Sequence, residues 1–394
     1  MGENNKPVAT GDSRKKGESD MEETVGRGLE DVVVAESDIC FIDGHEGRLL
    51  YRGYNVDDLA REATYEEVAY LLWHGHLPKS AELKAFTEAI GKEAFLPPDV
   101  LAFLAGVPAG ATPMEVLRTA VSMLSLSDPT SEHVGDQTDR TKALRLLAKT
   151  PSIVAAFDRL RNHQKPVMPR PDFGLAKNFL YMLHGEPPVD EDAHILDVCL
   201  ILHADHEFNA STFAARVTAG TLSDMYSAIT SAIGTLKGPL HGGANEQVMR
   251  MLLEIGAEDK VESWIKDALA NKKKISGFGH RVYRTEDPRA RHLRAFSEEI
   301  GTRRGDLKYF RMTQKVEQTV FAEKGIYLNV DLYSGSVYYQ MGIAIDLFTP
   351  IFAIARTAGW TTHVMEQLAH NRLIRPRAQY VGPERELWVP IEKR

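Results

Sequence analysis

The chain has 394 residues, of which 43% are hydrophobic, and this length is typical of roughly two or three domains with one large core or two modest ones. Its 47 basic and 55 acidic residues give a net charge of -8, which argues against a general nucleic-acid binder and favours a small-molecule partner. Cys40 and Cys199 are too few for a disulfide framework, and no apolar stretch approaches the ~20 residues that span a bilayer. Because the N-terminus also carries no secretory or transit pattern, we expect a cytoplasmic protein that binds neither nucleic acid nor a membrane.

The N-terminal part of the chain predicts a tail followed by a hairpin. Residues 1–28 are rich in Gly, Lys, Glu, Asp and Ser, which is typical of a disordered or partner-ordered tail. Val32–Val34 and Ile39–Phe41 then alternate in the period of a strand, and residues 43–47 supply Asp and Gly for a turn. We therefore expect a small N-terminal hairpin.

The pattern then becomes helical. Thr64 and Glu67 form a capping box ahead of an apolar stripe, and Gly75 is placed to end that helix. Residues 245–256 carry apolar side chains at i, i+3, i+4 and i+7, namely Val248, Met251, Leu252 and Ile255. Sustained helical periods with few strand-like runs indicate an all-α fold.

Two polar stretches interrupt the helical pattern. Residues 127–142 contain an Asp-Pro pair, and residues 165–171 contain three prolines, so both are predicted to be loops. Neither is long enough to separate independent domains, and composition alone reveals no domain boundary.

Three glycine-bounded segments lie far apart in the chain and hold two histidines and one carboxylate. Residues 238–245 have the sequence GPLHGGAN, residues 277–283 have GFGHRVY, and residues 329–335 have NVDLYSG. A carboxylate can take a proton from a carbon next to a carbonyl, a neutral histidine can stabilise the oxygen that gains charge, and a second histidine can protonate an electrophile. These groups are suited to carbon-acid chemistry.

In the order of these segments, and over about residues 37–380, the chain resembles the citrate synthase family. The resemblance implies a two-domain helical fold, with a large domain formed by residues 29–242 and 343–394 and a small domain formed by residues 243–342. It also implies a homodimer with its active site in the cleft between the domains. The expected substrates are oxaloacetate and acetyl-CoA, and no metal or redox cofactor is required.

The resemblance implies that His241 hydrogen-bonds the thioester carbonyl of acetyl-CoA and stabilises the enol or enolate. The structural alternative is a turn histidine that caps the helix beginning at Ala244. For His280, the resemblance implies the acid that protonates the oxaloacetate carbonyl.

The residues that follow His280 predict the start of a helix. Asp287 can cap it, Pro288 can take its first position, and Arg289 then lies in the first turn. The planar guanidinium suits bidentate binding of a carboxylate, and the resemblance implies that Arg289 holds a carboxylate of oxaloacetate.

Asp331 lies between apolar Val330 and Leu332, so partial burial could raise its pKa toward that of a useful base. A helix N-cap is an equally reasonable interpretation of the residue itself, because short Asp side chains are common there. The resemblance assigns Asp331 as the base that removes a methyl proton from acetyl-CoA.

Further residues predict substrate recognition. Residues 203–207, HADHE, combine two histidines and two carboxylates, which suggests a metal site, but the spacing fits no standard zinc pattern and no thiol supports it. The resemblance instead makes His206 an oxaloacetate ligand and His203 a structural residue. Arg356 lies late in an apolar helix, where an unpaired charge is costly and a bound dicarboxylate would offset that cost.

Two recognition predictions concern the dimer and the CoA. Arg375 matches the arginine that this family contributes across the dimer interface to the neighbouring site, although an exposed C-terminal cation is the alternative. The loop Gly277, Phe278 and Gly279, with Lys274 just before it, is predicted to bind CoA. Three consecutive lysines at 272–274 are also typical of a solvated face.

The favoured hypothesis is therefore an si-type citrate synthase. A 2-methylcitrate synthase that accepts propionyl-CoA, or dual activity, is the alternative, because one methylene is worth only about 1–3 kcal/mol of discrimination. Val330 and Phe352 are candidates for setting that pocket. A non-enzymatic sensor of CoA or a dicarboxylate would be expected to lack one of the chemical groups, yet all of them are present.

Overall fold

The computed structural model describes residues 27–29 and 32–394. The predicted tail, residues 1–28, lies almost entirely outside the described residues. Residues 37–374 form one compact unit, and the segments on either side of it, up to residue 36 and from residue 375, form the other. In the second unit, the C-terminal segment is mostly exposed and contains only the short 3-10 helix η5 (Ile391–Lys393).

The described residues form one small sheet and sixteen α-helices, which confirms the all-α prediction. The strands are β1 (Cys40–Asp43), β2 (Arg48–Tyr51) and β3 (Tyr54–Asn55). The helices are α1 (Val56–Glu62), α2 (Tyr65–His74), α3 (Ser80–Glu93), α4 (Pro98–Gly106), α5 (Pro113–Leu124), α6 (Asp136–Arg161), α7 (Leu175–His184), α8 (Asp190–His203), α9 (Ala210–Ala219), α10 (Met225–Leu236), α11 (Ala244–Ile255), α12 (Val261–Ala270), α13 (Ala290–Arg304), α14 (Lys308–Lys324), α15 (Asp331–Gln340) and α16 (Phe348–Ala369).

The N-terminal hairpin is confirmed as the antiparallel pair β1 and β2. Its turn forms because the Asp43 carboxylate accepts hydrogen bonds from the backbone N–H groups of His45 and Glu46, each at 2.9 Å. The prediction of a strand at Val32–Val34 was wrong: these residues are exposed and unpaired in the sheet. Period-two patterning did not produce a strand there, because these residues pair with none of the described strands.

This turn packs closely against the loop that follows His280. The Gly44 carbonyl accepts a hydrogen bond from the Arg284 N–H at 2.8 Å. A Cβ at Gly44 would lie only 2.2 Å from the Val282 carbonyl oxygen, so a larger residue would push the two segments apart. The hairpin therefore supports one wall of the candidate site.

The predicted helix signals are confirmed. Thr64 and Glu67 form a reciprocal capping box at the start of α2, and Gly75 ends that helix with a φ of 78°. In α11, the four apolar residues predicted to share one face are buried. These predictions are confirmed because the capping residues and the apolar stripe each favour the same helix.

The loop prediction for residues 127–142 was partly wrong, since α6 begins at Asp136. The reason is a buried ion pair one turn into the helix, in which Lys142 Nζ lies 2.9 Å from an Asp139 oxygen. Lys142 also donates to the carbonyl of His133 at 2.6 Å, which anchors the preceding loop. Residues 165–171 form no helix or strand, as predicted.

Helix α16 is the central element of the unit formed by residues 37–374. It packs against α2, α6, α8, α9 and α10, so it is buried on nearly every side. Side chains such as Trp360, Phe348 and Ile351 are at most 1% exposed, and each contributes about 1.5–3 kcal/mol by leaving water. Arg356 lies in the middle of this helix, not near its end as predicted.

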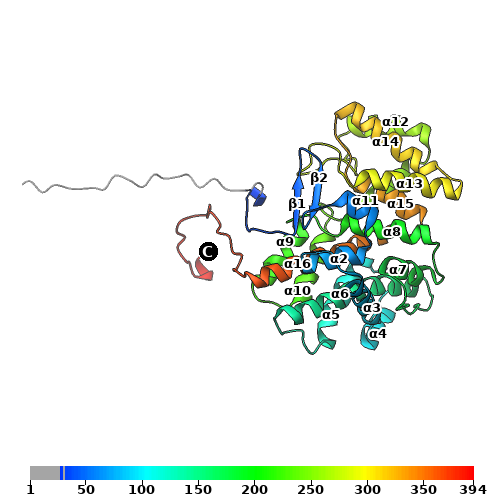
Figure 1. Cartoon of the computed structure of the whole chain (residues 1–394). Coiled ribbons are helices and arrows are strands. Elements are labelled where there is room, and N and C mark those ends of the chain that lie inside the picture. Colours follow the sequence, from blue (N-terminus) through cyan, green and yellow to red (C-terminus); the bar gives the residue numbers. More distant parts are fainter. Residues whose placement is uncertain (1–26, 30–31) are drawn as a thin grey trace, which may run out of the picture. The chain divides into compact units, whose positions relative to one another are not determined.

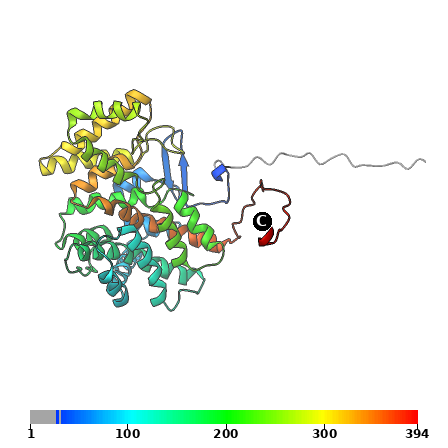
Figure 2. The same ribbon diagram turned by 180° about the vertical axis from the view of Figure 1, so that it is seen from behind.

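The helices of residues 243–342 pack mainly on one another, with α13, α14 and α11 against α15, and α12 against α14. Figure 1 shows α12, α13 and α14 gathered at one end of the unit, while α3 to α6 lie at the opposite end. Figure 2 shows the same separation from behind. Among the described residues, none of the helices combines the length and apolarity needed to cross a membrane.

Candidate active site

Two of the three predicted segments are paired with each other. The Asn329 N–H donates to the Gly277 carbonyl at 3.0 Å, and the Asn329 side chain donates to the Gly279 carbonyl at 3.0 Å. This short antiparallel contact precedes His280 on one segment and Asp331 on the other. The segments that carry His280 and Asp331 therefore lie side by side.

Glycine is required at the first position of this loop. Gly277 has a φ of 89°, and a Cβ there would lie 2.8 Å from Leu332 Cδ1. The loop Gly277–Gly279 thus gains its shape by packing directly on the start of α15, whether or not it also binds CoA.

The tautomer of His280 is set by two backbone N–H groups. Those of Val282 and Tyr283 donate to His280 Nδ1 at 3.0 and 3.1 Å, so the ring proton lies on Nε2. Burial, together with the positive charge of Arg289, lowers the pKa of His280 to about 4. The ring is therefore neutral at pH 7 and presents Nε2–H as a donor.

His241 is held by the start of α9. Its Nε2 lies 2.8 Å from the Ser211 hydroxyl and accepts from the Ser211 backbone N–H at 3.3 Å, so its proton lies on Nδ1. Burial and the charge of Arg356 lower the pKa of His241 to about 4. The alternative role as a cap of α11 is not supported, because Gly243 is the N-cap and has no side-chain cap.

Asp331 is the first residue of α15 and is partly buried. Its backbone N–H donates to the Asn329 side chain at 3.0 Å, while no described group donates to its carboxylate. Asp331 is therefore not the N-cap of this helix: that position is Val330, which makes no side-chain cap hydrogen bond. Burial raises the pKa of Asp331 to about 7, against the opposing charge of Arg289, which gives a carboxylate poised to act as a base near neutral pH.

Arg289 is 3% exposed and is bound bidentately by Asp287, with Nε to Oδ1 at 2.9 Å and Nη2 to Oδ2 at 2.7 Å. Burial alone would lower the pKa of Arg289, but the Asp287 carboxylate raises it above its ordinary value. Asp287 Oδ2 also accepts from the Val330 N–H at 3.2 Å, next to Asp331. The helix prediction was off by two residues: α13 begins at Ala290, and Arg289 directly precedes it.

Arg356 is 1% exposed on α16. Its Nε donates to the His203 carbonyl at 2.7 Å, and its guanidinium lies over the Phe352 ring at 4.7 Å. Burial lowers the pKa of Arg356, although the Asp205 carboxylate nearby opposes that effect. No described residue accepts a hydrogen bond from either Nη atom, so this charge has donors left for a ligand.

The histidines of residues 203–207 face the same region. The His206 ring lies 5.0 Å from the His280 ring, and its buried Nε2 has no partner among the described residues. His203 Nδ1 donates to the Cys199 carbonyl at 2.8 Å, which leaves its buried Nε2 as an unpaired acceptor. Within the described part of the chain, no group of three or more His, Cys, Asp or Glu side chains is arranged to hold a metal ion.

The sequence did not identify three of the residues that shape this site. Ser211 carries no local signal for contact with His241, which lies 30 residues away. Asp287 was identified only as a helix cap, and Tyr283 only as a letter of its segment. These roles depend on contacts between segments, which spacing does not reveal.

Two predicted residues have no described contact with the reacting side chains. Lys274 is exposed, and its charge is one of those that oppose the effect of burial on the pKa of Asp331. Arg375 begins the C-terminal segment that forms a unit separate from residues 37–374.

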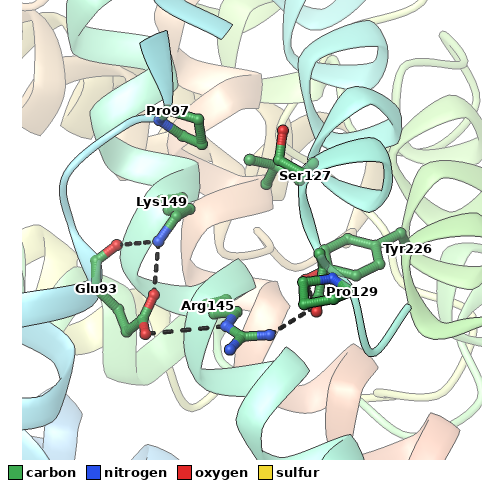
Figure 3. Close-up of a pocket in the computed structure, with 9 residues that line it drawn as sticks. Glu93, Pro97, Ser127, Pro129, Arg145, Lys149 and Tyr226 are labelled. Atoms are coloured by element: carbon green, nitrogen blue, oxygen red, sulfur yellow. Dashed lines mark hydrogen bonds and ion pairs between the residues drawn. The ribbon is translucent and has the colours of Figure 1, made fainter. Parts of the chain in front are cut away.

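A pocket of about 230 Å³ lies outside this site, among α3 to α6 and the start of α10. Figure 3 shows Arg145 and Lys149 pointing toward Glu93, and Lys149 Nζ lies 2.7 Å from a Glu93 oxygen. Arg145 also pairs with Asp128 at 2.7 Å. The charged side chains of this pocket therefore neutralise one another. The pocket is lined by none of the residues predicted to take part in the reaction.

Comparisons with known proteins identify the family of this chain. The family model described as "Citrate synthase, C-terminal domain" matches residues 28–377. "Citrate synthase 2" of Bacillus subtilis is 49% identical, over 94% of this chain and 100% of that protein. "2-methylcitrate synthase" of Mycobacterium tuberculosis is 43% identical, over 92% of each chain.

A solved structure shows the same fold. It is a ternary complex of carboxymethyl coenzyme A and oxaloacetate with the citrate synthase of Thermoplasma acidophilum. Its TM-score is 0.89 at 36% identity, and the match covers 94% of this chain and 99% of that one. The chain belongs to the citrate synthase family.

Proposed function

We propose that this protein condenses acetyl-CoA with oxaloacetate and hydrolyses the resulting citryl-CoA to citrate and CoA. The observation that carries this proposal is the pairing of the His280 and Asp331 segments. The paired segments carry a neutral histidine and a carboxylate whose pKa burial raises to about 7, and the positive charge of Arg289 acts on both side chains. Such a carboxylate is about half ionised at pH 7 and is basic enough to take a proton from carbon.

In the first step, Asp331 removes a proton from the methyl group of acetyl-CoA. His241 donates its Nδ1–H to the thioester oxygen, which gains negative charge as the enol or enolate forms. The Ser211 backbone N–H at 3.3 Å from Nε2 supports this tautomer, and the buried setting strengthens the hydrogen bond.

In the second step, the enol carbon attacks the keto carbon of oxaloacetate. His280 donates its Nε2–H to the keto oxygen and protonates it as the carbon–carbon bond forms. Water then cleaves the thioester of citryl-CoA, which gives citrate and CoA. The chemistry uses side chains alone and calls on no metal or redox cofactor.

Three side chains bind the dicarboxylate. Arg289, Arg356 and His206 have polar atoms without described protein partners, and both guanidiniums are nearly fully buried. The two carboxylates of oxaloacetate accept from both Nη groups of Arg356 and from Nη1 of Arg289, since Asp287 already holds the Nε and Nη2 of Arg289. Oxaloacetate binding therefore offsets the cost of burying positive charge in this wall.

The remaining predictions complete the site. A large domain of residues 29–242 and 343–394 closes on a small domain of residues 243–342, which excludes water from the enol. The protein is a homodimer in which Arg375 completes the site of the partner subunit. The loop Gly277, Phe278 and Gly279, together with Lys274, binds CoA.

The second candidate function is 2-methylcitrate synthesis from propionyl-CoA. The observation that favours it is the 43% identity to a relative named 2-methylcitrate synthase. Val330 and Phe352 flank the base and the buried arginine, respectively, so they are positioned to influence the size of the acyl pocket.

The experiment is release of free thiol from purified protein with oxaloacetate, with kcat/KM compared for acetyl-CoA and propionyl-CoA. A large preference for acetyl-CoA supports citrate synthesis. A preference for propionyl-CoA moves the protein to 2-methylcitrate synthesis, and no thiol release with either substrate contradicts the proposed function.

A further inference from the structure

Tyr283 has a buried hydroxyl that the mechanism above does not use. The residue is 4% exposed, and its hydroxyl has no hydrogen-bond partner among the described residues. A buried polar group without a partner is costly, and native proteins rarely keep one without a reason. A bound ligand is therefore the expected hydrogen-bond partner of this hydroxyl.

The surroundings of Tyr283 are those of the dicarboxylate site. Its ring centroid lies 4.5 Å from that of His280 and 5.8 Å from that of His206, whose buried Nε2 is also unpaired. Its backbone N–H donates to His280 Nδ1. Burial raises the pKa of Tyr283, against the positive charge of Arg289 close by, so the hydroxyl keeps its proton and remains a donor.

Arg289 alone does not satisfy a carboxylate at this position. Its Nε and Nη2 are already bound to Asp287, so only its Nη1 group is left for a ligand. A carboxylate has two oxygens and about four acceptor sites, and it needs further donors when it is buried. The protonated hydroxyl of Tyr283 supplies one.

We propose that Tyr283 is a further substrate-binding residue, whose hydroxyl donates a hydrogen bond to the oxaloacetate carboxylate held by Arg289. This inference rests on the proposed function, because it takes oxaloacetate as the ligand of the arginine pair. Tyr283 also positions His280, since its ring and its backbone N–H both contact that histidine.

The test compares Tyr283→Phe with the wild-type protein. The change removes only the hydroxyl and keeps the ring against His280. Tyr181→Phe, on α7 and outside the site, is the matched control. Binding of oxaloacetate alone is measured by calorimetry, the stability of the unliganded protein by its urea midpoint, and turnover by thiol release.

We expect Tyr283→Phe to raise the oxaloacetate Kd and KM at least about 10-fold, with kcat within about 3-fold of wild type, because a hydrogen bond to a charged group is lost. The urea midpoint should stay the same or rise, since the variant no longer buries an unpaired hydroxyl. Tyr181→Phe should change none of these values.

An oxaloacetate Kd for Tyr283→Phe within 2-fold of wild type would overturn the proposal. If the urea midpoint also fell while the Kd was unchanged, the hydroxyl would be making a hydrogen bond within the protein. Wild-type protein that binds oxaloacetate but releases no thiol would contradict the proposed function, while a weakened Kd in the variant would still support Tyr283. Wild-type protein that does not bind oxaloacetate would overturn both.

Discussion

Replacing Asp331 with Asn should stabilise the folded protein in a pH-dependent way. Burial raises the pKa of Asp331 from its ordinary value of 3.8 to about 7, so the folded state disfavours the ionised carboxylate. Each pKa unit corresponds to about 1.36 kcal/mol, so an ionised Asp331 costs the folded protein about 4 kcal/mol at pH 8. Asparagine has nearly the shape of the protonated acid and avoids that cost.

The sign of this effect follows from linkage. Between about pH 4 and pH 7 the folded state binds the proton and the unfolded state has released it, so the wild-type protein loses stability as the pH rises through this window. Above pH 7 the full cost is present. The pKa values of Asp331 in the folded and unfolded states set the size of the effect. The gain in unfolding free energy of Asp331→Asn over wild type should grow by about 2 kcal/mol between pH 5 and pH 8, after allowing for solvent screening of this partly exposed group.

The assay is urea unfolding of the wild-type and variant proteins at several pH values from 5 to 8. Asp259→Asn, an exposed residue on the 3-10 helix η3 (Glu258–Lys260), controls for the loss of one negative charge. A stability difference for Asp331→Asn that does not change with pH, or that shrinks as the pH rises, would refute the reasoning about burial.

Three further predictions follow from the same contacts. The kcat/KM for acetyl-CoA should fall about 10-fold for each pH unit below about 7, because Asp331 must be ionised. His241 and His280, with pKa values of about 4, stay neutral from pH 5.5 to 8 and do not contribute to this fall. A flat pH–rate profile would contradict the assignment of Asp331 as the base. Ser211→Ala should lower kcat about 10- to 100-fold with little change in the oxaloacetate KM, because His241 loses a partner 2.8 Å from Nε2; an effect on KM alone would place Ser211 in oxaloacetate binding instead. Arg356→Met should raise the oxaloacetate Kd at least about 100-fold by calorimetry, because two Nη donors are lost from a buried wall; an unchanged Kd would remove Arg356 from the site.

Local sequence signals predicted local structure well. The capping box of Thr64 and the stop at Gly75 are confirmed because each depends only on residues within one helix. The predictions failed where a distant or buried partner decides the structure. Val32–Val34 pairs with none of the described strands. The charged run from Asp136 to Lys142 is helical, with Lys142 and Asp139 neutralising each other in the interior.

The candidate site could be predicted as a set of residues but not as a geometry. The resemblance named His241, His280 and Asp331, and the structure pairs the His280 and Asp331 segments through Asn329. The resemblance could not show which ring nitrogen of each histidine carries the proton. For His241 this depends on the N–H of Ser211, and for His280 it depends on N–H groups of the loop that follows it. The domain division and the role of Arg375 stay predictions.

The central claim is that Asp331 is the base. Thiol release by Asp331→Asn, with oxaloacetate and acetyl-CoA, tests it most directly when oxaloacetate binding to the same variant is measured by calorimetry. The account predicts that kcat falls by at least about 1,000-fold while the oxaloacetate Kd stays close to that of wild type, because the arginine wall is intact. A near-normal rate in the variant would contradict it.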